Sequence, residues 1–107
     1  MTAKKVVKGS GKPEGPKLYT VEFTEEAKKN LSKLDVQTRT LIAAWISKNL
    51  YGCTNPREKG KALTGRLAQY WRYRVGKYRI ITDIQDSKLI ILVITVGKRD
   101  SIYSDKK

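Results

Sequence analysis

Apolar residues in the first half of the chain recur at spacings that predict one strand followed by a helix. Residues 18–23 (LYTVEF) alternate between apolar and polar side chains, as in a first strand. Thr24 suits the N-cap of a helix, and the two acids after it suit the positive end of a helix dipole. Ala27, Leu31 and Leu34 follow at i, i+4 and i+7, which predicts one buried face of a short helix.

A second helix is predicted to begin after the N-cap Asp35 and to run to about Tyr51, where Gly52 ends it. Its apolar side chains form a stripe at helical spacing, which we assign to the core. The stripe consists of Leu41, Ile42, Trp45, Ile46 and Leu50. Residues 53–69 contain Pro56, Gly60 and Gly65 and are expected to form a loop.

The second half of the chain predicts a meander of three strands. Residues 76–77 (GK) suit a two-residue type II′ turn, which needs glycine at the position where φ is positive. A second turn is placed at residues 86–87 (DS). Residues 88–96 are apolar on both faces and are therefore expected to form an interior strand. One strand, two helices and three further strands indicate an α+β fold.

The excess of positive charge indicates what kind of partner the chain binds. The chain has 107 residues, enough for one small domain, with 23 Lys and Arg against 10 Asp and Glu and a net charge of +13. Such an excess indicates a polyanion or a strongly acidic protein as partner. Residues 1–17 are expected to be a disordered basic tail ahead of one domain over residues 18–107.

The cellular setting follows from what the sequence lacks. With Cys53 as its single cysteine, the chain forms no internal disulfide, so we expect a cytoplasmic protein. No apolar run approaches the roughly 20 residues that a membrane-spanning helix needs, and no membrane association is expected.

Like charge is concentrated on the hairpin around residues 76–77. The predicted register places Arg74 directly opposite Arg79, with Arg72 on the same face. Directly opposed like charges destabilise a sheet, so stability alone does not explain this arrangement. We interpret the three arginines as a preorganised anion site; the alternative is that they only extend into solvent.

The end of the last strand is predicted to extend this site. A turn at residues 86–87 places Ile94 beside Arg79 and carries Lys98 onto the same face. Lys98 or Arg99 is therefore expected to join the arginines, with Tyr103 close behind.

The residue types restrict the chemistry that such a site can perform. The chain has no histidine, which excludes serine-type triads, histidine-pair ribonucleases and the usual zinc sites. Cys53 has no histidine to activate it, and the acids form no paired-carboxylate site or magnesium cage. No metal or cofactor is expected. Arginines can still bind a phosphodiester and stabilise the negative charge of a phosphorane, although arginine itself is a poor base.

Three segments together resemble the RelE toxins of bacterial type II toxin–antitoxin systems, in the RelE/ParE superfamily. They are residues 61–65 (KALTG), 70–81 (YWRYRVGKYRII) and 93–99 (VITVGKR), followed by Tyr103. The resemblance covers residues 18–103 and implies two helices on one side of an antiparallel-rich sheet. It implies a metal-independent endoribonuclease that cuts mRNA in the ribosomal A site, and a RelB-like antitoxin that wraps the toxin and covers or distorts the basic site.

The resemblance also implies roles for individual residues. Five residues match the catalytic positions of the family: Arg72, Arg74, Arg79, Arg99 and Tyr103. The flanking basic residues are expected to bind RNA: Lys59, Lys61, Arg66, Lys77 and Lys98. In the best-known member of the family the first two of these positions are lysines, whereas both are arginine here. The resemblance therefore implies charge stabilisation at these positions more directly than it implies a general base.

Two other functions are compatible with the sequence. A ParE-like toxin would inhibit DNA gyrase with the same fold, but that activity does not call for arginines gathered on the strands. A non-catalytic RNA-binding or antitoxin-binding module would use them only to neutralise charge, and its affinity would then depend strongly on salt.

Overall fold

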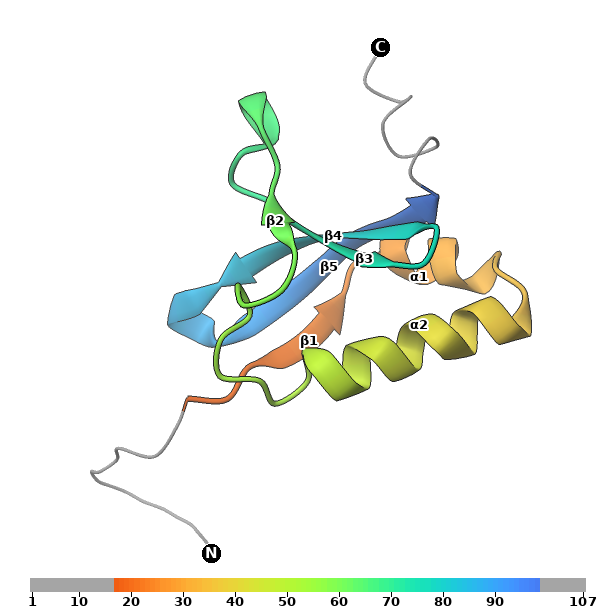
Figure 1. The fold of residues 1–107 in the computed structure, drawn as a ribbon, viewed down its shortest axis with the longest axis horizontal. Coiled ribbons are helices and arrows are strands. Elements are labelled where there is room, and N and C mark those ends of the chain that lie inside the picture. Colours follow the sequence, from red (N-terminus) through yellow and green to blue (C-terminus); the bar gives the residue numbers. More distant parts are fainter. Residues whose placement is uncertain (1–16, 99–107) are drawn as a thin grey trace, which may run out of the picture.

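Five strands form one mixed sheet in the order β1-β5-β4-β3-β2 in the computed structural model, which describes residues 17–98 (Figure 1). The strands are β1 (Thr20–Phe23), β2 (Lys61–Ala62), β3 (Trp71–Val75), β4 (Tyr78–Gln85) and β5 (Ile90–Lys98). The helices are α1 (Glu25–Ser32) and α2 (Val36–Asn49), with short 3-10 turns η1 (Gly65–Leu67) and η2 (Asp86–Lys88). β1 runs parallel to β5, and the other neighbours are antiparallel. The predicted α+β class is confirmed; apart from Lys17, the predicted basic tail (residues 1–17) lies outside the described residues.

Both helices begin where the sequence predicts them. The hydroxyl oxygen of Thr24 accepts a hydrogen bond from the amide of Ala27 (3.0 Å), and the carboxylate of Asp35 accepts one from the amide of Thr38 (3.1 Å). Each bond satisfies an amide that has no partner within its helix. α2 ends at Asn49, slightly before its predicted end. Among the described helices, none has the length and apolar character needed to cross a bilayer.

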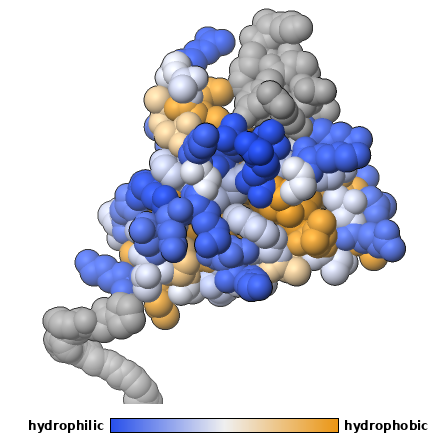
Figure 2. Space-filling model, viewed as in Figure 1, coloured by the Kyte–Doolittle hydropathy of each residue, from blue (hydrophilic) through white to orange (hydrophobic). Residues whose placement is uncertain are grey.

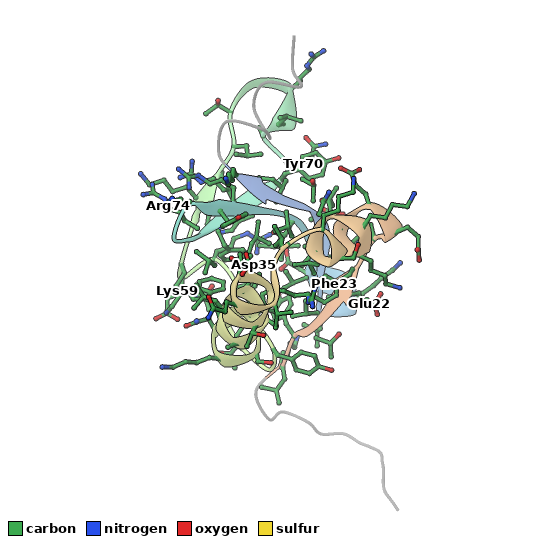
Figure 3. All side chains as sticks on the ribbon, turned by 90° about the vertical axis from the view of Figure 1, so that its right-hand side faces the viewer. Glu22, Phe23, Asp35, Lys59, Tyr70 and Arg74 are labelled. Atoms are coloured by element: carbon green, nitrogen blue, oxygen red, sulfur yellow. The ribbon has the colours of Figure 1, made fainter. Side chains whose placement is uncertain are left out.

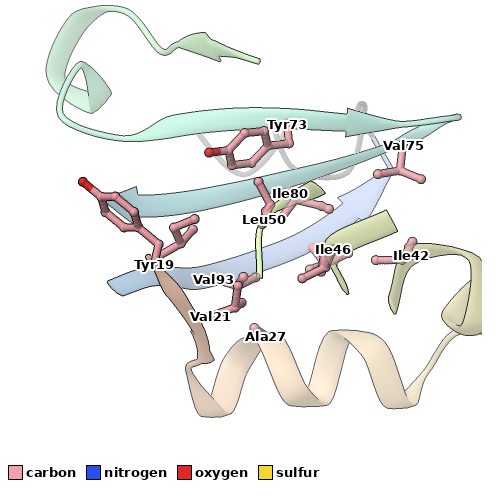
Figure 4. Close-up of a cluster of buried hydrophobic side chains, with 12 residues drawn as sticks. Tyr19, Val21, Ala27, Ile42, Ile46, Leu50, Tyr73, Val75, Ile80 and Val93 are labelled. Carbon is pink, nitrogen blue, oxygen red and sulfur yellow. The ribbon is translucent and has the colours of Figure 1, made fainter. Parts of the chain in front are cut away.

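The hydrophobic core lies between the sheet and the two helices, which pack on the same side of it (Figures 1 and 4). Ile42 and Ile46, one helical turn apart, point from α2 into this core. Leu41 is 58% exposed, so its assignment to the core is wrong. Each helical residue advances about 100° around the axis, and the position before Ile42 therefore turns toward the outside.

The first hairpin has the predicted register. Val75 pairs with Tyr78 and Arg74 pairs with Arg79 around a turn in which Gly76 has a φ of 59°. Glycine adopts this left-handed conformation without steric cost, as the type II′ turn requires.

The second hairpin differs from its prediction. Its loop is four residues long, from Asp86 to Leu89, and Leu89 closes it with a φ of 56°. A β-bulge then shifts the register between Ile81 and Thr82. As a result Gly97 lies beside Arg79, and the prediction that Ile94 occupies this place is wrong.

The segment predicted as a loop over residues 53–69 contains a strand that was not predicted, β2. β2 pairs Lys61 with Arg72 and Ala62 with Trp71, and forms one edge of the sheet. Two residues are too few to show an alternating pattern, which explains why the sequence did not reveal this strand.

Helix α1 supports the end of β5 beyond the last residue of β1. The side-chain oxygen of Asn30 accepts hydrogen bonds from the amide of Val96 and the hydroxyl of Thr95, each at 2.9 Å. The bond from Val96 satisfies an amide of β5 where the short β1 no longer pairs with it. β5 can therefore continue as a strand toward the residues after Lys98.

Candidate nucleic-acid interface

Three arginines occupy the face of β3 and β4 opposite the core. Arg74 and Arg79 are directly paired, and Arg72 lies two residues before Arg74 on the same face of β3. Tyr73 and Val75 alternate with these arginines and are buried on the helical side. The predicted juxtaposition of the three arginines is confirmed by the register.

The three arginines differ in their exposure to solvent. Arg74 is exposed and Arg72 is half-buried, whereas Arg79 is only 6% exposed. β4 is the central strand, so Arg79 has Arg74 on one side and Gly97 on the other. Gly97 has no side chain, so β5 contributes only backbone at the position beside Arg79. Surrounding strands hold Arg79 more firmly than Arg74, which suits it to bind a group in a defined orientation.

Further positive charge surrounds the arginine face. The predicted RNA-binding residues Lys59, Lys61, Arg66 and Lys77 are all exposed. Figure 3 shows Lys59 and Arg74 on one side of the molecule and Glu22 on the other. Hydrophilic side chains are gathered across the middle of the face in Figure 2, over the region of β2 and β3. Lys61, which pairs with Arg72, and Lys77, in the turn between Arg74 and Arg79, therefore add positive charge for a polyanion beside the arginines. Arg66 lies apart from them, on η1.

Lys98 does not lie on the arginine face. It is exposed at the end of β5 and pairs with Tyr78, whose side chain lies on the opposite face of β4 from Arg79. Its predicted position beside the arginines is therefore wrong, because the longer loop and the bulge shift β5 by an odd number of residues. Arg99 and Tyr103 lie outside the described residues.

A network of side chains that the sequence did not reveal anchors the segment before β2. Arg57 donates to both carboxylate oxygens of Asp86, at 3.0 and 3.1 Å, and the hydroxyl of Tyr19 donates to Asp86 at 2.6 Å. The hydroxyl of Tyr73 donates to the carbonyl of Pro56. Asp86 therefore holds Arg57 in place, and Tyr73 holds the neighbouring Pro56. No local pattern signals this pair, because 29 residues separate Arg57 from Asp86.

The electrostatics of this network favour a charged Asp86 and a neutral Tyr19. The Arg57 guanidinium, with help from the Tyr19 hydroxyl, holds the pKa of Asp86 below its usual value. The hydrogen bond that Tyr19 donates to Asp86 correspondingly raises the pKa of Tyr19. Elsewhere, burial raises the pKa of the Cys53 thiol, which agrees with the expectation that Cys53 is no nucleophile.

Gly60 brings the segment that carries the lysines close against β3. It has a φ of 83°, and a Cβ atom there would lie 2.3 Å from the carbonyl oxygen of Arg72. The indole of Trp71 donates to the carbonyl of Lys59 at 2.7 Å. Lys59 and Lys61 therefore project from a backbone that is fixed on both sides of Gly60. Among residues 17–98, no three His, Cys, Asp or Glu side chains lie together as metal ligands would.

Comparison with known proteins agrees with this geometry. The profile of the family described as "ParE toxin of type II toxin-antitoxin system, parDE" matches residues 21–103. Toxin RelG of Mycobacterium tuberculosis is 31% identical over 85 residues, which cover 79% of this chain and 95% of that protein. The chain belongs to the RelE/ParE superfamily of type II toxins. A putative RelE-like toxin protein of Escherichia coli is 34% identical to this toxin over 83 residues, covering 77% of it and 84% of that protein.

Solved structures share the fold of this superfamily toxin. A chain of the toxin–antitoxin complex RelBE2 from M. tuberculosis matches it with a TM-score of 0.70 and 29% identity, covering 77% of this chain and 92% of that one. The isolated RelE toxin of E. coli matches with a TM-score of 0.62 and 27% identity, covering 82% and 94% respectively. The resemblance seen in the sequence is thus confirmed at the level of superfamily and fold.

Proposed function

We propose that this toxin is a ribosome-dependent endoribonuclease that cuts mRNA in the A site and so stops translation. The observation that carries the proposal is the directly paired Arg74 and Arg79, with Arg72 beside them on the same face. Three guanidinium groups on rigid neighbouring strands suit a phosphodiester, because each can donate two parallel hydrogen bonds to phosphate oxygens. The named relatives RelG and the RelE-like toxin of E. coli support the same assignment.

The reaction requires no group that the chain lacks. The 2′-hydroxyl of the RNA loses its proton and attacks the adjacent phosphorus, and the bond from phosphorus to the 5′ oxygen breaks. That oxygen takes up a proton, leaving a 2′,3′-cyclic phosphate and a 5′-hydroxyl. Arg79 and Arg74 bind the scissile phosphate, and Arg72 stabilises the charge that builds on its oxygens in the transition state.

The remaining steps fall to residues at the carboxy terminus and to the RNA. Arg99 is assigned to the leaving-group side, and Tyr103 to base stacking or to orienting the 2′-hydroxyl. Arginine stays protonated, so the proton transfers are assigned to Tyr103, to the RNA itself or to water.

The partners follow from the same surface. We assign a cognate RelB-like antitoxin that covers the arginine face, since related toxins have been crystallised as complexes with antitoxins. When released from the antitoxin, the toxin would bind the ribosome and its mRNA in the cytoplasm. Inhibition of DNA gyrase is the second candidate, because the matching family profile carries the name ParE.

Primer extension on a translated message tests the proposal. Wild-type protein is expected to cut within the A-site codons of the translated message. Arg79→Ala is expected to lower the single-turnover cleavage rate about 100-fold or more, as when one preorganised donor is removed from a transition state. Lys33→Ala is the matched control, since it removes one positive charge from the exposed C-cap of α1.

Arg79 is buried, so Arg79→Ala could lose activity simply by failing to fold. Two further variants separate this effect from the loss of the guanidinium group. Arg79→Lys keeps the charge but loses the planar fork, and Arg74→Ala changes an exposed residue of the same pair. Absence of cleavage by folded wild-type protein, with and without ribosomes, would contradict the nuclease. A DNA supercoiling assay would then examine gyrase inhibition.

A further inference from the structure

A cavity of about 350 Å³ lies where α2 faces the segment before β2 and the adjoining part of β3. Its volume falls at the lower end of the roughly 300–1,000 Å³ typical of sites for small ligands. The lining residues come from segments far apart in the sequence: Trp45, Lys59, Gly60, Lys61, Arg72, Tyr73 and Arg74. We propose that this cavity binds one nucleotide of the RNA, with its base against Trp45 and its phosphate on Lys59 and Lys61. This inference rests on the proposed function and extends it to a nucleotide outside the scissile bond.

The charge of the lining selects an anion. Four of the seven lining residues, Lys59, Lys61, Arg72 and Arg74, carry a positive charge and none carries a negative one. The two lysines come from β2 and the residues before it. The two arginines alternate with Tyr73 on β3, so their side chains extend from the other face of the sheet and add positive charge at the open edge of the cavity. Arginines and lysines in such an arrangement bind phosphate groups.

The aromatic side of the cavity selects a flat group. Trp45 is half-buried on α2, and its ring lies 5.6 Å from that of Tyr73, tilted by 53°. Tyr73 is fully buried and supports Trp45 from behind. The accessible part of Trp45 can therefore stack with a base, as aromatic residues do in proteins that bind single-stranded RNA.

The walls of the cavity are held in place without a ligand. Gly60 packs its backbone against Arg72, where a Cβ atom would clash at 2.3 Å, and Trp71 holds the carbonyl of Lys59. Tyr73 bonds to the carbonyl of Pro56 at the start of the same segment. A site that needs little reorganisation loses little free energy to ordering on binding.

β2 also leaves the cavity open at the edge of the sheet. It pairs only with Trp71 and Arg72, so the outer edge of β3 is uncovered by β2 from Tyr73 onward. An RNA strand lying on the exposed Arg74 can therefore place a neighbouring nucleotide in the cavity. A nucleotide fits the combination of an aromatic wall with four cations better than a purely acidic peptide, which has no base to stack.

Tryptophan fluorescence tests this assignment in the full chain. The probes are a 2′-O-methyl RNA trinucleotide, which has no 2′-hydroxyl to attack the phosphate, and the same backbone without bases. Wild-type protein is expected to bind the base-bearing trinucleotide about tenfold more tightly, with quenching of its tryptophan emission. Trp45→Ala is expected to bind both probes equally.

Trp45→Phe keeps an aromatic ring in the cavity and leaves Trp71 as the remaining tryptophan. It should retain most of the preference for bases but lose the quenching, provided that its thermal unfolding shows a folded protein. Equal binding of the two probes by wild type, or quenching that persists in Trp45→Phe, would overturn the nucleotide site. Stronger quenching by an acidic, aromatic-containing peptide would overturn it in favour of a protein occupant.

The two proposals fail separately. If wild type cuts mRNA in the A site but does not distinguish the two probes, the nucleotide site is wrong and the nuclease stands. If it prefers the base-bearing probe but cuts no message, the site stands and the nuclease is wrong.

Discussion

Tyr73 joins the hydrophobic core to the segment that carries the lysines of the basic surface. Its ring is fully buried against Trp45, and its hydroxyl donates to the carbonyl of Pro56. Burial raises the pKa of Tyr73 well above the usual tyrosine value, so the hydroxyl stays protonated as a donor. One side chain thus acts in both the packing and the site.

Tyr73→Phe is expected to lower the free energy of unfolding by about 1–3 kcal/mol, because it leaves the carbonyl of Pro56 without its hydroxyl donor. Urea unfolding followed by tryptophan fluorescence measures this change. Tyr51→Phe is the matched control, since Tyr51 is 59% exposed, and it should change stability by less than about 0.5 kcal/mol. Equal stabilities for the two variants would show that the bond to Pro56 contributes nothing.

At the scale of elements, the two hairpins show what a sequence can and cannot predict. The turn at Gly76 allows few conformations, and its register was predicted correctly. The second turn contains no glycine, and its four residues end in Leu89 with positive φ, an uncommon conformation for leucine. The bulge that follows depends on how β5 packs between its neighbours, which no local pattern records.

Asp86 in the second turn connects this hairpin to Arg57, and its effect should depend on pH. Its pKa is lower in the folded chain than in the unfolded chain, so the pair stabilises the fold at neutral pH and loses this effect as pH falls through the folded pKa. Asp86→Asn should cost about 0.5–1 kcal/mol at pH 7 because the pair is partly exposed.

Thermal unfolding at a series of pH values measures this dependence. The Tm values of wild type and Asp86→Asn should converge between about pH 5 and pH 2. Asp83→Asn removes a charge from the same hairpin, where the carboxylate accepts a hydrogen bond from Gln85 instead of Arg57. A constant difference between wild type and Asp86→Asn at all pH values would contradict the role of the carboxylate charge.

At the scale of the whole molecule, the described residues carry only part of the net charge of +13, and they carry it unevenly. The ion pairs Lys28–Glu25 and Arg57–Asp86 neutralise charge on α1 and behind β2, whereas Arg74 and the lysines near it are exposed. RNA binding to such a surface releases condensed counterions, so its affinity should fall steeply with salt.

Arg74→Gln is expected to reduce the slope of log affinity against log salt by about 0.7, the value for one lost phosphate contact on a single strand. Fluorescence anisotropy with a labelled 2′-O-methyl RNA, between about 50 and 200 mM salt, measures this slope. Lys33→Gln, on the helical layer, should leave the slope unchanged. An identical change in both variants would mean that only net charge matters, and not the position of Arg74.

The sequence by itself determined the α+β class, both helix starts, the first hairpin and the three arginines on one face, because each depends on neighbours within a few residues. Only the tertiary structure decided that Arg79 is buried beside Gly97, that Lys98 leaves the arginine face and that Asp86 holds Arg57. Trp45 was correctly expected to pack in the core, but its place beside the lysines was not visible. Such features depend on contacts between residues far apart in the chain, where the loop length and bulge of one hairpin set which side chains meet.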